Sequence, residues 1–210
     1  MYNINYNKYD KLVPHDWFWS TWKEFSKPQT APGDDYFVAL GDSFTCGYQM
    51  KHYRDCWVQK LSDKTNLGHV NISWNGASIE ATCRFLDKSL RIDDSKLHIV
   101  MLPYPWRTES ILVFKGERNR RIKDSQITIE ECVKKITCTL KRYENKRVIF
   151  SNVWGYTDEL KDPLRKLDYK NFMLNDQEWL DRAMDGKQGH AGPKTHDVFV
   201  KQIQRFIKNK

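Results

Sequence analysis

Short apolar runs that alternate with helix-like segments constrain the fold of this chain more than any other feature. Residues 36–40 form a continuous apolar run that ends in Gly-Asp-Ser, as expected of a buried parallel strand leading into a tight turn. Further strand-like runs follow at residues 69–74, 97–102, 147–153 and, more briefly, 171–174. Helical patterns occupy residues 55–65, 78–90 and 127–142 and resume from Pro193. This alternation predicts an α/β sandwich with a mostly parallel sheet, whose site forms where the strands end.

The length and composition fit one globular domain. The chain has 210 residues, with 8 Trp, 10 Tyr and 10 Phe to build a core. Residues 1–35 are aromatic and irregular, so we expect an arm that packs on a single domain spanning residues 36–210. No run of about 18 apolar residues exists, and the first residues lack the pattern of a secretory signal. We therefore expect a cytoplasmic protein that has no membrane partner.

The cysteines argue against a metal centre. There are five of them, and none forms a Cys-x-x-Cys pair or a paired Cys/His spacing. An odd number of cysteines without such spacing fits reduced thiols buried as small apolar side chains. The sequence therefore predicts no metal site.

The positive charge is the second constraint. Lysine and arginine number 35 against 27 aspartate and glutamate, which gives a formal net charge of +8. Such an excess fits an anionic partner such as nucleic acid, an acidic glycan or a membrane surface, and it fits equally a lysine-rich surface without function. Residues 115–123, after the third predicted strand, carry five cations and one anion. We expect this segment to be a loop, either a lid or clamp for an anionic substrate or a solvated surface.

Polar residues at the predicted strand ends form the candidate site. Ser43 lies in a tight turn after the first strand, where its hydroxyl can face the sheet edge and its N–H can help to hold an oxyanion. Gly76 follows the second strand and can supply a second N–H donor. His190 precedes the last helix and can act as a base to Ser43, whereas His196 fits a first-turn helix position, either on the surface or satisfied by a cap. Each pattern taken alone also fits an ordinary turn or helix cap.

Together these segments resemble the sequence blocks of the SGNH/GDSL hydrolase superfamily. Gly41-Asp42-Ser43-Phe44 looks like the first block, Gly76-Ala77-Ser78 like the second, and His190-Ala191-Gly192-Pro193 like the last. Their order, spacing and strand context agree across residues 36–207. The His-x-Gly-Pro-Lys-x-His ending is similar to that of SGNH-like proteins encoded by bacteriophages.

The resemblance implies a fold and a mechanism. The fold is a three-layer α/β/α sandwich with a five-stranded parallel sheet, the flavodoxin-like SGNH hydrolase fold. Ser43 is then the nucleophile and His190 the general base and later acid, with an upstream Asp as its partner. The N–H groups of Ser43 and Gly76 form the oxyanion hole. Ester hydrolysis passes through an acyl-serine without a metal or organic cofactor, and in a phage-encoded protein it takes place in the host-cell cytoplasm.

The end of the third predicted strand departs from the family's pattern. The family usually offers an Asn there, whose side chain completes the oxyanion hole, but this chain reads Leu102-Pro103-Tyr104-Pro105-Trp106-Arg107. Arg107 can bind an anionic group of the substrate or pair with Glu109, and both interpretations stay open. Asn75 is a candidate substitute for the missing amide.

The acid of the triad is the second departure. The family usually places Asp three residues before the catalytic His, but position 187 is a lysine. We assign the acid to Asp185, five residues before His190, because two extra loop residues still allow it to reach. Asp181 is the less favoured substitute, since we expect it on a helix around Trp179.

These residues predict a serine esterase acting on a small-molecule or glycan ester, such as an O-acetyl group on a polar or anionic substrate. The alternative is an SGNH-fold binding protein of weak or no activity with an anionic partner, for which nucleic acid is open but not favoured. Acyl transfer to an acceptor other than water would use the same residues. The sequence specifies neither the substrate nor the oligomeric state.

Overall fold

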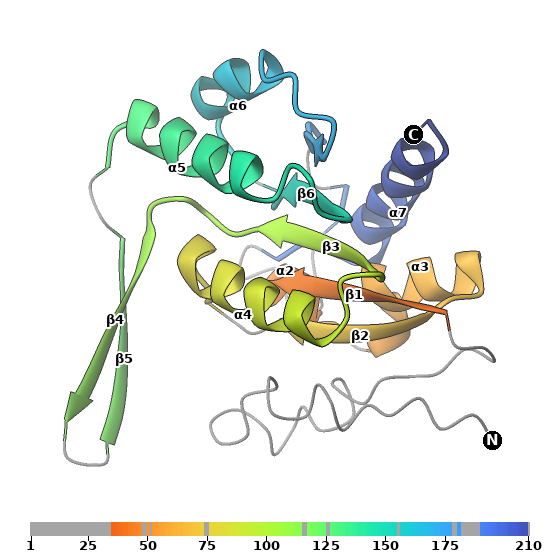
Figure 1. Ribbon diagram of the computed structural model, residues 1–210, viewed down its shortest axis with the longest axis horizontal. Coiled ribbons are helices and arrows are strands. Elements are labelled where there is room, and N and C mark those ends of the chain that lie inside the picture. The colour runs from red at the N-terminus through yellow and green to blue at the C-terminus, as the bar shows by residue number, and fades with distance from the viewer. Residues whose placement is uncertain are drawn as a thin grey trace.

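A computed structural model shows the chain folded around one parallel sheet (Figure 1). It describes residues 35–47, 50, 52–73, 76–114, 117–124, 127–154, 156–177, 180–181 and 190–209. The aromatic arm expected over residues 1–35 therefore lies, apart from Asp35, outside the described residues. Within the described ranges, no helix is both long enough and apolar enough to cross a membrane.

The sheet has five parallel strands in the order β2-β1-β3-β6-β7. Their bounds are β1 Tyr36–Gly41, β2 Gly68–Ser73, β3 Leu97–Leu102, β6 Val148–Asn152 and β7 Phe172–Met173. The predicted α/β fold with a five-stranded parallel sheet is confirmed, and the boundaries of these five strands each lie within one residue of their predicted places. Because β2 and β3 flank β1 on opposite sides, the chain reverses direction across the sheet beside β1. Ligand sites in open parallel sheets form at such a reversal.

Helices cover both faces of the sheet, as right-handed crossovers in this strand order require. On one face α3 (Trp57–Thr65) packs against α7 (Pro193–Lys208) (Figure 1). On the other face α4 (Ile79–Ile92) lies against β1 and β3, and α5 (Ile129–Arg142) packs against α6 (Asp158–Arg165). Two short elements, α2 (Ser43–Cys46) and the 3₁₀ turn η1 (Tyr53–Asp55), connect β1 to α3. The result is the expected three-layer sandwich.

Side chains at the helix starts explain where these helices begin. The Ser78 hydroxyl accepts a hydrogen bond from the N–H of Ala81 at the start of α4. The Thr128 and Glu131 side chains bond reciprocally to each other's backbone N–H groups at the start of α5, which forms a capping box. Pro193 occupies the first helical position of α7, where a missing N–H costs no hydrogen bond.

Burial is concentrated in the central strands and in the aromatic contact between α3 and α7. All six residues of β1 are buried, which explains its continuous apolar sequence. The Trp57 and Phe199 rings meet edge to face with centroids 5.4 Å apart, and Trp154 contacts Phe199 at 5.1 Å. Ile203, one turn after Phe199, is also buried, as the helical spacing predicts.

The prediction of a loop at residues 115–123 is wrong for residues 117–123, which the structure describes. These residues belong to a strand of an antiparallel hairpin. Strand β4 (Arg107–Phe114) pairs with β5 (Glu117–Asp124), and Phe114 stands opposite Glu117 in the register. Only Lys115 and Gly116 separate the strands in the sequence, and a two-residue connection that contains glycine is typical of tight hairpins. The hairpin projects away from the sheet (Figure 1).

Helix α6 is a further element that the sequence pattern did not predict. It has eight residues, contains Pro163, and is acidic in its first turn. A helix of eight residues offers few positions from which to recognise helical periodicity. An internal proline also argues against a helix, because proline removes a backbone hydrogen bond and usually occurs where a helix ends. Burial of Leu160 and Leu164 against the core stabilises it despite the proline.

Gly41, the last residue of β1, is required by the close approach of the turn that follows. Its φ is +157°, and an added Cβ would lie 2.2 Å from Thr45 Oγ1 and 2.9 Å from the carbonyl oxygen of Met101. Both contacts are shorter than van der Waals packing permits. The glycine therefore lets the chain turn directly over the end of the neighbouring strand β3.

We expect Gly41→Ala to lower the free energy of unfolding by about 3 kcal/mol or more, since overpacking of a tight site typically costs about 1–3 kcal/mol and Met101 contributes rigid backbone. Urea denaturation followed by tryptophan fluorescence measures the change. Gly192→Ser is the control, because Gly192 has a φ of −89° that any residue adopts. Equal stabilities of wild type and Gly41→Ala would contradict this account of the turn.

Candidate active site

The turn after β1 holds Ser43 in a fixed place at the carboxyl edge of the sheet. Ser43 is the first residue of α2, and Asp42 caps this short helix by accepting the N–H of Phe44 at 3.1 Å. Asp42 is fully buried and Ser43 is 1% exposed. A buried cap directly before the serine leaves its backbone little freedom, so the direction of its hydroxyl is set by the fold.

His190 meets Ser43 across 147 residues of sequence. Its Nε2 lies 3.0 Å from Ser43 Oγ, within hydrogen-bond distance. The imidazole is partly exposed and packs against the Phe44 ring, with centroids 5.1 Å apart. A serine hydroxyl bonded to an imidazole that reaches solvent is the arrangement that proton transfer from the hydroxyl requires.

Asp181 holds the start of α7, and with it the segment that carries His190. Its two carboxylate oxygens accept the N–H groups of Lys194 and Thr195, each at 2.9 Å. Its own carbonyl accepts the N–H of Gly192 at 2.9 Å. These hydrogen bonds lower the pKa of Asp181 despite the opposing effect of partial burial. We expected Asp181 on a helix around Trp179, but the structure uses it as the cap of α7.

His196 has a structural role. It is 1% exposed, and its Nδ1 accepts the N–H of Trp57, the first residue of α3, at 2.9 Å. Cys56 precedes that helix without a side-chain cap, so His196 satisfies a backbone donor there. His196 lies in the first turn of α7, as the sequence predicts, but it is buried and its partner Trp57 is 139 residues away in the sequence.

A second Ser–His pair lies in the interior. Ser89, near the end of α4, bonds to His98 Nε2 at 2.7 Å, and the other ring nitrogen of His98 bonds to the carbonyl of Lys96. Both Ser89 and His98 are fully buried, and they join α4 to the start of β3. The pair fastens a helix to the sheet at the edge opposite Ser43.

The structure places the remaining predicted site residues unequally. Gly76 lies between β2 and α4, at the same edge as Ser43, with a φ of +75° that an L side chain rarely adopts. Asn75 and Asp185 lie outside the described residues.

Arg107 has a partner that neither sequence interpretation named. Its Nη1 lies 2.7 Å from Asp42 Oδ2, and its guanidinium stands 4.9 Å from the centre of the Tyr104 ring. Asp42 and Arg107 are 65 residues apart in the sequence, so no local sequence pattern predicts their contact. The positive charge of Arg107 therefore lies next to the turn that carries Ser43.

Metal-binding clusters do not occur among the described residues, in that no group of three or more His, Cys, Asp or Glu side chains is arranged to hold an ion. The five cysteines, Cys46, Cys56, Cys83, Cys132 and Cys138, form no disulfide in the part of the chain that the structure describes.

Comparison with known proteins gives matches at the level of three-dimensional structure. No protein-family model and no curated protein sequence matches the chain. The psychrotrophic esterase EstA from Pseudoalteromonas sp. matches with a TM-score of 0.55 at 16% identity, over 84% of this chain and 98% of that one. A protein of the lipolytic G-D-S-L family from Desulfitobacterium hafniense DCB-2 matches with a TM-score of 0.55 at 14% identity, over 82% and 99%.

A third match is a family two carbohydrate esterase from Clostridium thermocellum in complex with cellohexaose, with a TM-score of 0.52 at 12% identity, over 88% of this chain and 66% of that one. The chain has the fold of the SGNH/GDSL hydrolases. The predicted resemblance is thereby confirmed for the architecture, and the structural neighbours of this SGNH fold are esterases and lipolytic proteins.

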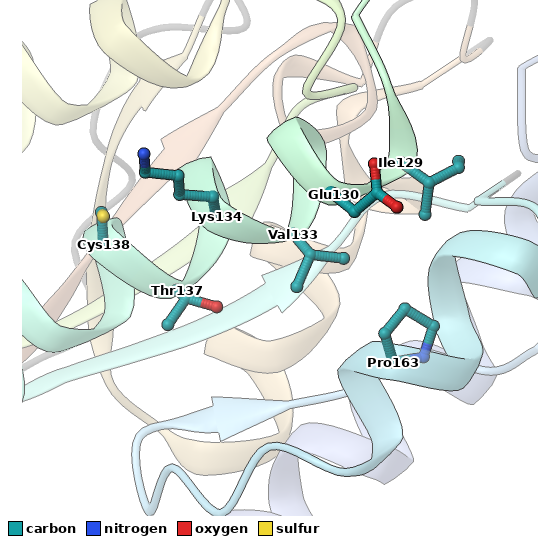
Figure 2. Close-up of a pocket in the computed structure, with 7 residues that line it drawn as sticks. All are labelled: Ile129, Glu130, Val133, Lys134, Thr137, Cys138 and Pro163. Atoms are coloured by element: carbon teal, nitrogen blue, oxygen red, sulfur yellow. The ribbon is translucent and has the colours of Figure 1, made fainter.

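This SGNH fold also has an open hollow between α5 and α6, away from Ser43 (Figure 2). Its volume is about 490 Å³, and its surface is mainly apolar. None of the predicted site residues lines it. The lining residues are Ile129, Glu130, Val133, Lys134, Thr137, Cys138 and Pro163.

Four buried titratable groups link the stability of the SGNH fold to pH. Burial lowers the pKa of His69 and His98 to about 4 and that of His196 to about 3, from 6.5. Burial raises the pKa of Asp42 from 3.8 to about 6, although Arg107 acts to lower it. At a pH between the folded and unfolded pKa of each histidine, the unfolded chain binds more protons at that histidine. At a pH between the two pKa values of Asp42, the folded chain binds more protons there. The histidines therefore destabilise the fold as pH falls, and Asp42 opposes them.

We expect the free energy of unfolding to decrease as pH falls from neutral. Near about pH 5, three histidines gain protons on unfolding and Asp42 loses one, so the slope corresponds to a net uptake of about two protons, or about 3 kcal/mol per pH unit. Urea denaturation at a series of pH values measures it. His196→Gln should reduce the slope by about one proton. A stability that stays constant or rises on acidification would contradict these assignments.

Proposed function

We propose that this protein is a serine esterase in which Ser43 is the nucleophile and His190 the general base. The observation that carries the proposal is the 3.0 Å hydrogen bond between His190 Nε2 and Ser43 Oγ. A neutral imidazole within hydrogen-bond reach converts a weakly nucleophilic hydroxyl into a strong nucleophile. The likeness in fold to esterases supports the same chemistry.

The reaction proceeds in two halves. Ser43 Oγ bonds to the ester carbonyl carbon while its proton passes to His190 Nε2, and the carbonyl oxygen takes the negative charge. The carbon–oxygen bond to the alcohol then breaks, and the alcohol leaves with the proton held by His190. Water attacks the resulting acyl-serine with His190 again as the base, which releases the carboxylic acid and restores Ser43.

Backbone donors stabilise the charge that develops on the carbonyl oxygen. We assign this role to the N–H groups of Ser43 and Gly76, with the Asn75 side chain as a third donor. The positive φ of Gly76 supports its assignment, since such a conformation turns the backbone in a way that a side chain would hinder. One oxyanion donor is typically worth about 10²–10³ in kcat, so these groups determine the rate.

Asp185 is the proposed partner of His190. A carboxylate on the far side of the imidazole fixes its tautomer and stabilises the cation formed during acylation. Asp181 is less suited to this role, because both of its carboxylate oxygens already accept N–H groups of α7.

The proposed substrate is a small-molecule or glycan ester, with an O-acetyl group on a polar or anionic carrier as the leading case. A structural neighbour that is a carbohydrate esterase with bound cellohexaose supports a glycan. Hydrolysis and transfer of the acyl group to a sugar acceptor use the same acyl-serine, so product analysis with added sugars distinguishes them.

We expect Ser43→Ala to lower kcat for p-nitrophenyl acetate by about a thousandfold or more, because the nucleophile is lost. Release of p-nitrophenol measures the rate, and a fluorophosphonate probe followed by peptide mapping shows which serine reacts. Ser89→Ala is the matched control, since Ser89 belongs to the buried Ser–His pair and should keep the wild-type kcat.

A Ser43→Ala variant that hydrolyses the ester at the wild-type rate would contradict the esterase proposal. The acid is tested in the same assay, where Asp185→Asn should lower kcat strongly and Asp181→Asn chiefly the stability. The reverse order would move the role to Asp181.

The projecting hairpin favours a second candidate function, the binding of an anionic polymer such as nucleic acid. Strand β5 carries Arg118, Arg120, Arg121 and Lys123 against Glu117 and Asp124. A two-stranded ribbon of this kind fits the width of a nucleic-acid groove, and clustered cations bind phosphates without sequence preference. Such binding is compatible with a slow esterase as well as with an inactive one.

We expect the triple variant Arg118→Gln/Arg120→Gln/Arg121→Gln to weaken binding of duplex DNA and to reduce the slope of log K against log salt by about 3. Fluorescence anisotropy at several salt concentrations measures both. The matched control removes three exposed cations of α7, through Lys201→Gln, Arg205→Gln and Lys208→Gln. Equal loss in both triple variants would show a general charge effect and contradict a role for the hairpin.

A further inference from the structure

We propose that Arg107 is a positioning residue of the reaction, which acts through Asp42 to hold the turn that carries Ser43. This inference rests on the proposed esterase function and goes beyond it. It chooses between the roles open to Arg107, because a guanidinium paired with a buried carboxylate contributes little net charge to attract an anionic substrate.

Both oxygens of Asp42 are engaged, and they fasten the turn from two directions. Oδ1 accepts the N–H of Phe44 at 3.1 Å and so closes the turn on itself. Oδ2 accepts a hydrogen bond from Arg107 Nη1 at 2.7 Å, which ties the turn to the first residue of β4. Since Ser43 lies between Asp42 and Phe44, any movement of the carboxylate displaces the nucleophile. Losses of only about 1 Å in such alignment can cost about a hundredfold in rate.

Arg107 is itself held from several elements. Its guanidinium lies over the Tyr104 ring, and the Tyr104 hydroxyl donates to the carbonyl of Trp154 at 2.8 Å. Lys135 of α5 donates to the carbonyl oxygens of Pro105 and Arg107, at 2.8 and 3.4 Å. Arginine thus reaches Asp42 from a rigid base, as a residue that positions another must.

The ionised state of Asp42 depends on this contact. Asp42 is fully buried, and burial raises its pKa to about 6 even with the opposing attraction of Arg107. The phenols of Tyr104 and Tyr156, which also interact with Asp42, are neutral, since burial raises the pKa of Tyr104 to about 12 and also raises that of Tyr156 well above its ordinary value. Arg107 is the cation that acts on Asp42 among the described residues, so without it Asp42 would take up a proton at higher pH.

The pH dependence of Ser43 reactivity follows from this coupling. The ion pair requires ionised Asp42, and His190 must be neutral to act as a base. Two groups must therefore lose protons before Ser43 is fully reactive. We expect the acid limb of log kcat/KM against pH to approach a slope of two, where a lone histidine would give a slope of one.

The experiment measures the rate at which a fluorophosphonate probe labels Ser43, together with p-nitrophenyl acetate kinetics, at a series of pH values. Arg107→Met should lower kcat by about 10–100-fold with little change in KM, and should move the acid limb to higher pH by about one unit or more. Arg107→Lys should restore part of kcat and most of the limb, because it returns the charge. Arg142→Met is the matched control, since it removes an exposed arginine from the Arg142–Asp87 pair.

Asp42→Asn is the second variant, for use if Arg107→Met does not fold. Its side-chain amide oxygen can still accept the N–H of Phe44. This variant should lower kcat and reduce the slope of the acid limb to one. An unmoved acid limb in Arg107→Met, or a raised KM at constant kcat, would overturn the positioning role, the latter in favour of substrate binding. A wild-type protein whose Ser43 never reacts overturns the esterase proposal and this inference together, whereas a reactive wild type with equally reactive Arg107→Met overturns this inference alone.

Discussion

A carboxylate buried directly before the candidate nucleophile is the constraint on which the rest of the site depends. Asp42 is fully buried, so it requires partners for both oxygens, and the fold supplies them from the Phe44 backbone and from Arg107. Meeting that requirement brings the connection after β3 to the turn after β1. Two neighbouring strands of the sheet are thereby joined by a charge pair at the edge where Ser43 lies.

The same edge receives the end of the chain. The cap that Asp181 forms fixes where α7 begins, and the contact between Trp57 and Phe199 seats α7 against α3. Once the helix is seated, His190, three residues before its first residue, stands beside Ser43. The proposed dyad is thus a product of helix packing and capping, whose own energies have no connection with catalysis. Buried His196, which caps α3 from α7, takes part in the same seating.

The sequence allows prediction of whatever depends on local pattern. Strands could be located because a five- or six-residue apolar run is what a strand buried on both faces needs, and Ser43, Gly76 and His190 could be selected because each adjoins such an element. The Asp42–Arg107 contact could not be predicted, because it joins residues 65 positions apart. The sequence around each residue contains no pattern that identifies the other. The hairpin could not be predicted for a different reason, because β5 is almost entirely polar and lacks the apolar alternation that marks a strand with one buried face.

The interior pair of Ser89 and His98 shows how little a short distance between two such groups means. These residues are closer to each other than Ser43 and His190 are, at 2.7 against 3.0 Å. Yet His98 is sealed from solvent, and Ser89 lies in the last turn of α4, where helix carbonyls would repel an oxyanion. One polypeptide thus holds both the Ser–His geometry proposed to be reactive and a buried counterpart of it. A Ser–His distance alone therefore does not identify a catalytic pair. Whether backbone N–H groups or carbonyl groups face the serine oxygen must be considered as well, and the two pairs of this chain differ in that respect.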